Sequence, residues 1–289
     1  MAETILVTAG TGTVGRHVVT ELGDGNTDTA VRVATRDPRT ARDRFGDAIE
    51  AVDFDFARPE TWGETLAGVD GVFLVRPPGV AVDEMTGFVD AAARVGVEQI
   101  AYLSTLGADK NPLIPHHRIE NHIVDAAVDD TLLRASFFAQ NLHEVHGRDV
   151  VERDEIFVPA GSGETSFVDA RDVGAVGALV LGERGHENVA YDLTGPTALT
   201  YDEVAAVFSD VLGRPITYAD PSVVTFVRRM YARGVTLGYV LLMVGIYTTA
   251  RLGLAGRVTD DVARLLDRPP RSIRDYVEDY ADRFRPPVA

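Results

Sequence analysis

Three glycines near the amino terminus form the one spacing in this chain that specifies a ligand. Gly10, Gly12 and Gly15 make the pattern G-x-G-x-x-G, which follows the apolar segment TILVT and precedes the helical pattern RHVVTEL. Glycines at this spacing let the backbone turn tightly against a pyrophosphate, and the amides at the start of the next helix face its negative charge. The alternative is a glycine-rich turn that binds nothing. We predict a dinucleotide-binding loop made of Gly10, Thr11, Gly12, Thr13, Val14 and Gly15.

Arg36 follows the second apolar segment, VRVAT, at the position that selects between the two nicotinamide dinucleotides. A fold that prefers NAD usually carries Asp or Glu here, about 20 residues past the glycines. Arginine instead offers a planar, bidentate grip on a 2′-phosphate, which favours NADP(H). Two alternatives stay open. A surface ion pair with Asp37 would occupy the guanidinium, and Asp37 could itself hold a ribose, so NAD(H) is retained as the second candidate.

Three further residues follow predicted strands, at the edge where doubly wound sheets bind their ligands. Asp55 could accept a hydrogen bond from the adenine amine, or it could cap a helix or turn. Pro77 stiffens a loop beside the expected nicotinamide. Ser104 should point into the cleft, although its hydroxyl could also satisfy loop amides. We predict that all three contact the cofactor.

The elements that position these residues alternate between strand and helix. The predicted strands are Thr4–Thr8, Ala30–Thr35, Ile49–Asp53, Gly71–Val75, Gln99–Ser104 and Asp130–Arg134. The helix patterns between them are Val14–Leu22, Arg39–Phe45, Glu60–Leu66, Asp83–Val95 and His116–Ala127. Several strands are unbroken apolar runs, which is typical of parallel strands buried on both faces. This rhythm predicts an α/β fold with a doubly wound parallel (Rossmann) sheet.

The second half of the chain is predicted to be mostly helical after a loop-rich stretch, VPAGSGETSFVDARD. Thr200 and Glu203 form a capping box that opens one helix. The predicted helices are Arg171–Leu181, Tyr201–Leu212, Ser222–Tyr231, Val235–Thr249, Asp260–Leu266 and Ile273–Phe284, with short strands at Ala190–Leu193 and Ile216–Tyr218 between them. We predict a Rossmann domain over residues 1–150. Residues 151–289 form a smaller lobe that mostly caps the substrate, with some segments returning to the sheet.

Composition narrows the functional classes. The 289 residues include no cysteine, so disulfides and thiolate metal sites are excluded. The net charge of −16 repels phosphate backbones, and nucleic acid is therefore not an expected partner. So acidic a surface also suggests adaptation to a salt-rich cytoplasm, where screening relieves self-repulsion. The amino terminus lacks a basic region and a cleavage site, so a cytoplasmic location is predicted.

The segment Gly234–Ala250 contains 17 uncharged residues, at the lower limit for a membrane-spanning helix. Three glycines and three threonines dilute its hydropathy. We therefore predict a buried or lid helix and no membrane contact. A face between two copies of the chain and a contact with a lipid-like substrate are the other roles considered, so a homodimer stays open.

Taken together, these segments resemble the NmrA-like group of atypical short-chain dehydrogenases/reductases, near the NAD(P)H:quinone oxidoreductase type. The matching stretches span nearly the whole chain in order: VTAGTGTVG, VRVATRDP, GVDGVFLVRPP, GVEQIAYLSTLGA, HHRIENHI, TLLRASFFAQNL, PAGSGETSFVDARDVGAV, YDLTGPTALTYDEVA and LLDRPPRSIRDYV. One departure is visible. Ala9 replaces the first glycine of the family's usual G-x-x-G-x-x-G, and Gly10 restores a binding pattern.

The usual proton donor of short-chain dehydrogenases, Tyr-x-x-x-Lys, cannot be built from this chain. Its only lysine is Lys110, and the residue four positions earlier is Leu106. The resemblance implies that His116 occupies a helix start where related reductases carry Lys or His. A histidine there could bind the nicotinamide ribose or relay a proton. We predict His116 and Lys110 as the catalytic residues; a solvent-exposed histidine without a role is the alternative.

The segment TLLRASFFAQN should pass the nicotinamide as it leaves the sixth strand. Phe137 and Phe138 are predicted to wall an aromatic substrate pocket, although core aromatics would have the same pattern. Asn141 could bind the carboxamide of the cofactor or hold the loop. His143 and His146 lack further convergent ligands, so no metal site is predicted.

Two functions follow from these observations. The first is an NADP(H)-dependent oxidoreductase that transfers a hydride to a quinone or similar small apolar acceptor. The second is a non-catalytic NADP(H) redox sensor that acts through a protein partner. The resemblance covers both kinds of protein. The apolar second lobe favours the enzyme, while the missing Tyr-Lys pair favours the sensor.

Overall fold

A computed structural model describes residues 3–24 and 29–285 of the chain. These residues form two compact units. Unit 1 comprises the described part of Met1–Ala135, with Ala170–Leu193 and Arg264–Asp267. Unit 2 comprises Ser136–Asp169, Thr194–Ala263 and the described part of Arg268–Ala289.

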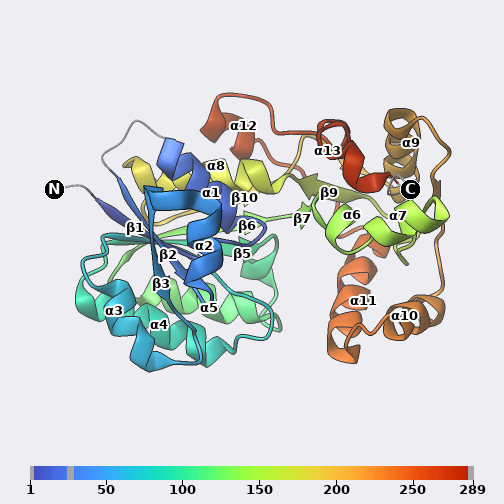
Figure 1. The fold of residues 1–289 in the computed structure, drawn as a ribbon. Helices are drawn as coiled ribbons and strands as arrows, with labels where there is room; N and C mark the ends of the chain where they lie inside the picture. The colour runs from blue at the N-terminus through green and yellow to red at the C-terminus, as the bar shows by residue number, and fades with distance from the viewer. Residues whose placement is uncertain (1–2, 25–28, 286–289) are drawn as a thin grey trace. The chain divides into compact units, whose positions relative to one another are not determined.

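Unit 1 is built on a seven-stranded parallel sheet with the order β10-β6-β5-β4-β1-β2-β3 (Figure 1). The strands are β1 (Thr4–Thr8), β2 (Ala30–Thr35), β3 (Ile49–Asp53), β4 (Gly71–Val75), β5 (Gln99–Thr105), β6 (Asp129–Ala135) and β10 (Val189–Leu193). The first four begin and end at the predicted residues. The order reverses beside β1, because β2 pairs on one side of it and β4 on the other. Such a reversal is where doubly wound sheets bind ligands.

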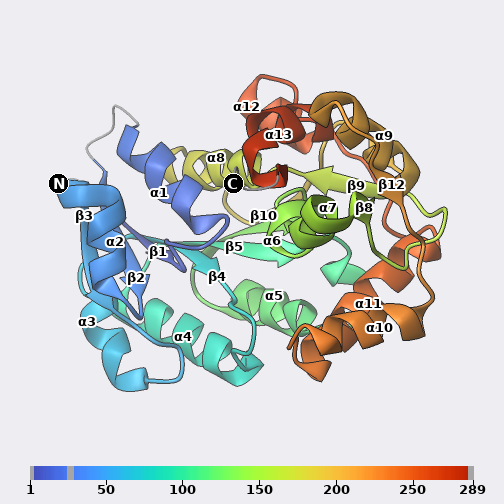
Figure 2. The same ribbon diagram turned by 45° about the vertical axis from the view of Figure 1, so that its right-hand side comes forward.

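Helices cover both faces of this sheet. They are α1 (Gly15–Asp24), α2 (Pro38–Phe45), α3 (Trp62–Leu66), α4 (Val82–Val95), α5 (Pro115–Asp125) and α8 (Ala170–Gly182). In both ribbon views α1 and α8 lie over one face and α3, α4 and α5 over the other (Figures 1 and 2). The predicted α/β doubly wound fold is thereby confirmed.

Both sides of the sheet are closely packed. On the α4 side, Phe54, Phe56 and Phe88 meet edge to face with ring centroids 4.7 to 5.4 Å apart. On the α8 side, a Cβ at Gly177 would lie 2.6 Å from the ring of Phe73, so only glycine lets α8 approach the sheet this closely. The buried central strands explain why β1 and β4 read as unbroken apolar runs.

Unit 2 is mostly helical. Its helices are α6 (Asn141–Glu144), α7 (Gly147–Arg153), α9 (Tyr201–Leu212), α10 (Val223–Ala232), α11 (Leu237–Arg251) and α13 (Ile273–Asp279), while α12 (Asp261–Leu266) divides between the units. Its short strands are β7 (Phe137–Phe138), β8 (Glu155–Ile156), β9 (Thr165–Val168), β11 (Ala198–Leu199) and β12 (Thr217–Tyr218). The predicted capping box is confirmed, because Thr200 Oγ1 accepts from the Glu203 amide at 3.2 Å and Glu203 Oε2 accepts from the Thr200 amide at 2.8 Å.

The structure adds detail to two segments of the second half. The loop-rich stretch contains a strand, β9, which is fully buried between β7 and β11. A four-residue strand with Thr and Ser carries too few apolar positions to show a period. The predicted strand at Ala190–Leu193 is confirmed as part of β10, which pairs with β6 and extends the main sheet.

The uncharged segment Gly234–Ala250 contributes most of α11, which is 15 residues long. Across residues 3–24 and 29–285, no helix combines the length and hydropathy that a bilayer crossing requires.

Candidate functional site

The glycine loop between β1 and α1 has the geometry of a phosphate cradle. The Gly12 amide donates to the Ala9 carbonyl at 2.8 Å and closes a tight turn. A Cβ at Gly15 would lie 2.4 Å from that carbonyl oxygen, and a Cβ at Gly10 would lie 2.7 Å from Val33. Both glycines are therefore required by close packing. Ala9 itself has φ +51°, in the left-handed region that favours glycine.

Asp37 is committed to capping α2. Its Oδ1 accepts from the amides of Arg39 and Thr40 at 3.1 and 3.2 Å, and its Oδ2 accepts from the Thr40 hydroxyl at 2.7 Å. The Thr40 hydroxyl and the cap amides lower the pKa of this carboxyl below its ordinary value. These bonds use most of the acceptor capacity that a ribose would need.

Arg36 is exposed at the end of β2. Within the described parts of the chain it forms neither a hydrogen bond nor an ion pair, so the alternative of a pair with Asp37 is not what the structure contains. An arginine free at this position is available to a 2′-phosphate.

Arg44 is a cation near the glycine loop that the sequence reasoning missed. Its Nη1 donates to the Thr11 carbonyl at 3.3 Å. Partial burial lowers its pKa, and the nearby charge of Arg16 lowers it further. Arg44 therefore adds positive charge beside the loop. Arg44 lies in the last turn of α2, whose only buried residue is Ala41, and no local pattern distinguishes it from a surface arginine.

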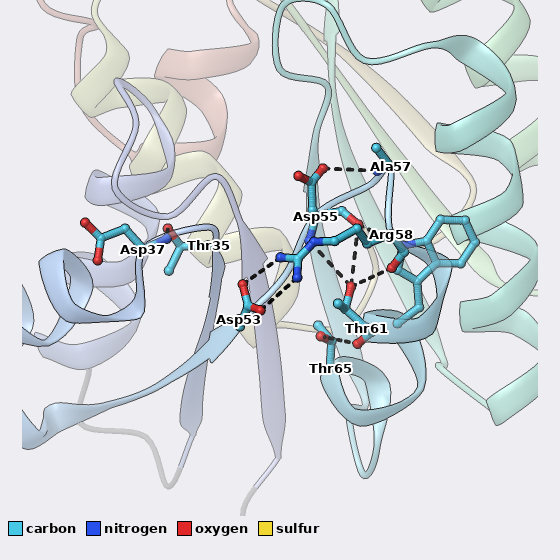
Figure 3. Close-up of polar contacts among 9 residues, drawn as sticks. Thr35, Asp37, Asp53, Asp55, Ala57, Arg58, Thr61 and Thr65 are labelled. Carbon is cyan, nitrogen blue, oxygen red and sulfur yellow. Dashed lines mark hydrogen bonds and ion pairs between the residues drawn. The ribbon is translucent and has the colours of Figure 1, made fainter.

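Figure 3 shows the turn that follows β3, where Asp55 was predicted to contact adenine. The carboxylate of Asp53 pairs with Arg58 through two bonds of 2.8 and 3.0 Å. Asp55 uses Oδ1 to accept from the Ala57 amide at 3.0 Å, and its carbonyl accepts from Trp62 Nε1 at 3.2 Å. The predicted turn role is therefore present, and Oδ2 of Asp55 has no bond to the residues that the structure describes.

His116 lies at the start of α5 and contacts a tyrosine from β5. The Tyr102 hydroxyl and His116 Nδ1 are 2.8 Å apart. Burial, together with the nearby charge of Arg76, lowers the pKa of His116 to about 4. Burial also raises the pKa of Tyr102 above its ordinary value. Both groups are neutral near pH 7, which leaves Nε2 of the imidazole for a ligand.

Ser104 is buried at the end of β5 and donates its hydroxyl proton to Glu120 Oε1 at 2.5 Å. Glu120, also buried, accepts from Arg134 through both of its oxygens, with a shortest distance of 2.7 Å. This triad ties α5 to β5 and β6. Ser104 retains only its lone pairs for a cofactor.

The remaining predicted residues are placed as follows. Lys110 is exposed at the end of a 3₁₀ helix, Ala108–Lys110, and nothing in the structure orients its amine. Pro77 follows β4 in unit 1. Phe137, Phe138 and Asn141 lie in unit 2, with Phe137 packed edge to face on Phe167 at 5.5 Å. The structure thus gathers the glycine loop, Arg36, Asp55, Ser104 and His116 in one unit and the predicted aromatic pocket in the other.

The two histidines that were considered as metal ligands bond to tyrosines instead. His143 contacts the Tyr276 hydroxyl and His146 contacts the Tyr247 hydroxyl. Burial lowers the pKa of His146 to about 4. No set of three or more His, Asp or Glu side chains converges as a metal site among the residues described.

The parallel sheet, the glycine cradle and the helix that begins at Gly15 define a dinucleotide-binding Rossmann protein. The chain belongs to the NmrA-like family, whose model matches residues 1–248. It is 30% identical over 287 residues to an NAD(P)H azoreductase of Xenophilus azovorans, covering 97% of this chain and 99% of that protein. It is 32% identical over 292 residues to a (4-alkanoyl-5-oxo-2,5-dihydrofuran-3-yl)methyl phosphate reductase of Streptomyces griseus, covering 98% and 99%.

Among solved structures, an NADPH-dependent quinone oxidoreductase of Escherichia coli superimposes with a TM-score of 0.84 at 25% identity. The match covers 96% of this chain and 99% of that one. The predicted family is confirmed. The predicted nicotinamide cofactor agrees with these relatives, one named for NAD(P)H and another for NADPH.

Proposed function

We propose that the protein is an NADP(H)-dependent reductase that passes a hydride to a quinone or similar small, flat acceptor. The observation that carries the proposal is an exposed, unpaired Arg36 beside a glycine cradle that leaves no room for side chains at Gly10 and Gly15. The azoreductase and the quinone oxidoreductase among the similar proteins support this reaction class.

The residues of unit 1 suit the cofactor. The amides at the start of α1 would face its diphosphate. Arg36 would bind the 2′-phosphate, with Arg44 as a second cation close to the loop. The open Oδ2 of Asp55 is available to the adenine amine. Roles for Pro77 and for Ser104 beside the nicotinamide, and for Asn141 at its carboxamide, stay proposals.

When bound, the nicotinamide supplies a hydride to the acceptor. His116 is neutral, so at pH 7 it acts as a hydrogen-bond donor or acceptor and not as a stored acid. The Tyr102 hydroxyl holds its ring in one orientation. We propose that His116 positions the ribose or the acceptor, and that the proton for the reduced acceptor comes from water. Lys110 is exposed, and a catalytic role for it stays a proposal.

The test measures NADPH oxidation in the presence of several quinones, monitored by absorbance. Cofactor binding is measured in parallel by calorimetry. Turnover that depends on the quinone supports the proposal. Tight NADP⁺ binding with no turnover would favour the sensor, a second candidate that rests on the absence of a Tyr-x-x-x-Lys pair in the sequence. No binding of either dinucleotide would remove both candidates.

A further inference from the structure

Arg76 lies at the ligand-binding edge of the sheet. It is the first residue after β4, between Val75 and Pro77. β4 pairs with β1, which leads into the glycine loop, and with β5, which carries Tyr102. The carboxyl ends of these three strands meet at the edge where doubly wound sheets hold their ligands.

Arg76 has no partner of opposite charge. Its Nε is buried and has no hydrogen-bond acceptor, and no ion pair joins it to any residue that the structure describes. A buried donor left without an acceptor costs free energy unless a ligand supplies the acceptor. The chain has 44 acidic residues against 28 basic ones, so carboxylates are in excess.

Other arginines of the same sheet receive carboxylates. Arg32 on β2 binds Glu50 at 2.7 Å, and Arg134 on β6 binds Glu120 at 2.7 Å. Arg76 therefore differs from these arginines of the same sheet, because no carboxylate of the described residues pairs with it.

The groups near Arg76 do not neutralise it. Its positive charge acts on both Tyr102 and His116, and both side chains are neutral. Glu120 also acts on this pair, but its oxygens already bind Ser104 and Arg134. The charge of Arg76 therefore acts on a neutral imidazole, and no carboxylate within residues 3–24 and 29–285 pairs with it, which is the setting for an anion brought by a ligand.

The phosphates of the cofactor have other candidate partners. The glycine loop and α1 lie at the end of β1, and Arg36 and Arg44 lie beyond it on the β2 side. Arg76 lies on the opposite side of β1, toward β5 and His116.

We propose that Arg76 recognises an anionic group, a carboxylate, sulfonate or phosphate, carried by the acceptor itself. The site would then select negatively charged acceptors over neutral ones with the same ring. This inference rests on the proposed reductase function and names the substrate class of that site.

The test compares two acceptors, 2-methyl-1,4-naphthoquinone and 1,4-naphthoquinone-2-sulfonate, in wild type, Arg76→Met and Arg76→Lys. The matched control is Arg94→Met, which removes an exposed arginine from the end of α4 in the same unit. In Arg76→Met, kcat/KM for the sulfonate should fall about ten- to hundredfold, the loss expected for one charge-assisted contact. In the same variant, kcat/KM for the neutral quinone and the KM for NADPH should change by less than about twofold. Arg76→Lys should keep part of the preference for the sulfonate.

Equal losses for both acceptors would overturn the proposal, because Arg76 would then act on the reaction itself or on the fold. A raised KM for NADPH with an unchanged acceptor preference would also overturn it and would assign Arg76 to the cofactor.

A binding measurement separates this proposal from the reductase function. If wild type binds NADP⁺ but reduces neither acceptor, the reductase function fails. Calorimetry of naphthalene-2-sulfonate with the NADP⁺ complex still tests Arg76. Binding by wild type and Arg94→Met that is lost in Arg76→Met supports the proposal. Equal binding by all three proteins, or none by wild type, overturns it.

Discussion

The hydroxyl of Tyr102 and Nδ1 of His116 lie 2.8 Å apart in unit 1, although Tyr102 belongs to a central strand and His116 to the start of a helix. Tyr102 is fully buried and His116 is half-buried, and both remain uncharged near neutral pH. The pair therefore orients an imidazole without storing a proton on it. This relationship decides how acid affects the protein.

The first prediction concerns stability against pH. The pKa of His116 is about 4 in the folded protein and near 6.5 when unfolded, so the unfolded chain takes up the proton first as pH falls. The contribution of His116 to the free energy of unfolding is thus fully present above about pH 6.5 and is lost as the pH falls toward 4. At pH 5 the loss from this residue is about 2 kcal/mol. Between about pH 7.5 and pH 5, His116→Gln should lose less free energy of unfolding than wild type, as measured by urea denaturation.

The control for this experiment is His122→Gln, which changes a half-buried histidine on the same helix whose Nε2 lies 2.7 Å from Asp90 Oδ1. It should not reduce the loss of unfolding free energy toward acid, because pairing with Asp90 favours the folded state as the imidazole gains a proton. A wild-type slope in His116→Gln would show that His116 is not buried as a neutral group.

The second prediction concerns cofactor choice. Arg36→Ala should weaken NADPH binding by about ten- to hundredfold, since a guanidinium–phosphate contact is lost, and should change NADH binding by less than about threefold. Calorimetry with both dinucleotides measures the ratio. Arg94→Ala is the charge-matched control and should leave it unchanged. A similar loss for NADPH and NADH would remove Arg36 from the 2′-phosphate site.

The third prediction concerns the residue that departs from the family's glycine pattern. Ala9 has φ +51°, so Ala9→Gly should raise the free energy of unfolding by about 1 kcal/mol through relief of left-handed strain. Ala92→Gly, in the buried helical face of α4, should instead lower it by about 1 kcal/mol. Chemical denaturation compares the two. Destabilisation by both substitutions would mean that the Ala9 side chain contributes more by packing than its backbone costs.

The fourth prediction concerns salt. With a net charge of −16, the folded chain repels itself, and added salt shortens the range of that repulsion. The thermal midpoint should rise between about 0.1 M and about 2 M KCl. The thermal midpoint of the variant Asp43→Asn/Asp47→Asn, which lacks two exposed charges in and just after α2, should rise less than that of wild type. A midpoint independent of KCl would count against adaptation to salt.

Sequence alone determined the features that depend on neighbours along the chain. Unbroken apolar runs marked β1 and β4, the Thr200–Glu203 box marked the start of α9, and the glycine spacing marked the cradle. Each of these signals is local. Strand burial, helix capping and turn geometry act over a few residues and leave a pattern that can be read directly.

Tertiary structure alone decided how the candidate site is charged and bonded. Two contacts join residues from different elements: Tyr102 with His116, and Ser104 with Glu120. The lack of a partner for Arg76 likewise depends on which elements pack around it. The same holds for β10, which reached the main sheet only by pairing with β6. Burial and pairing across the sheet depend on which segments pack together, and no spacing along the chain encodes them. Whether an arginine is neutralised or left open for a ligand is for that reason a property of the fold.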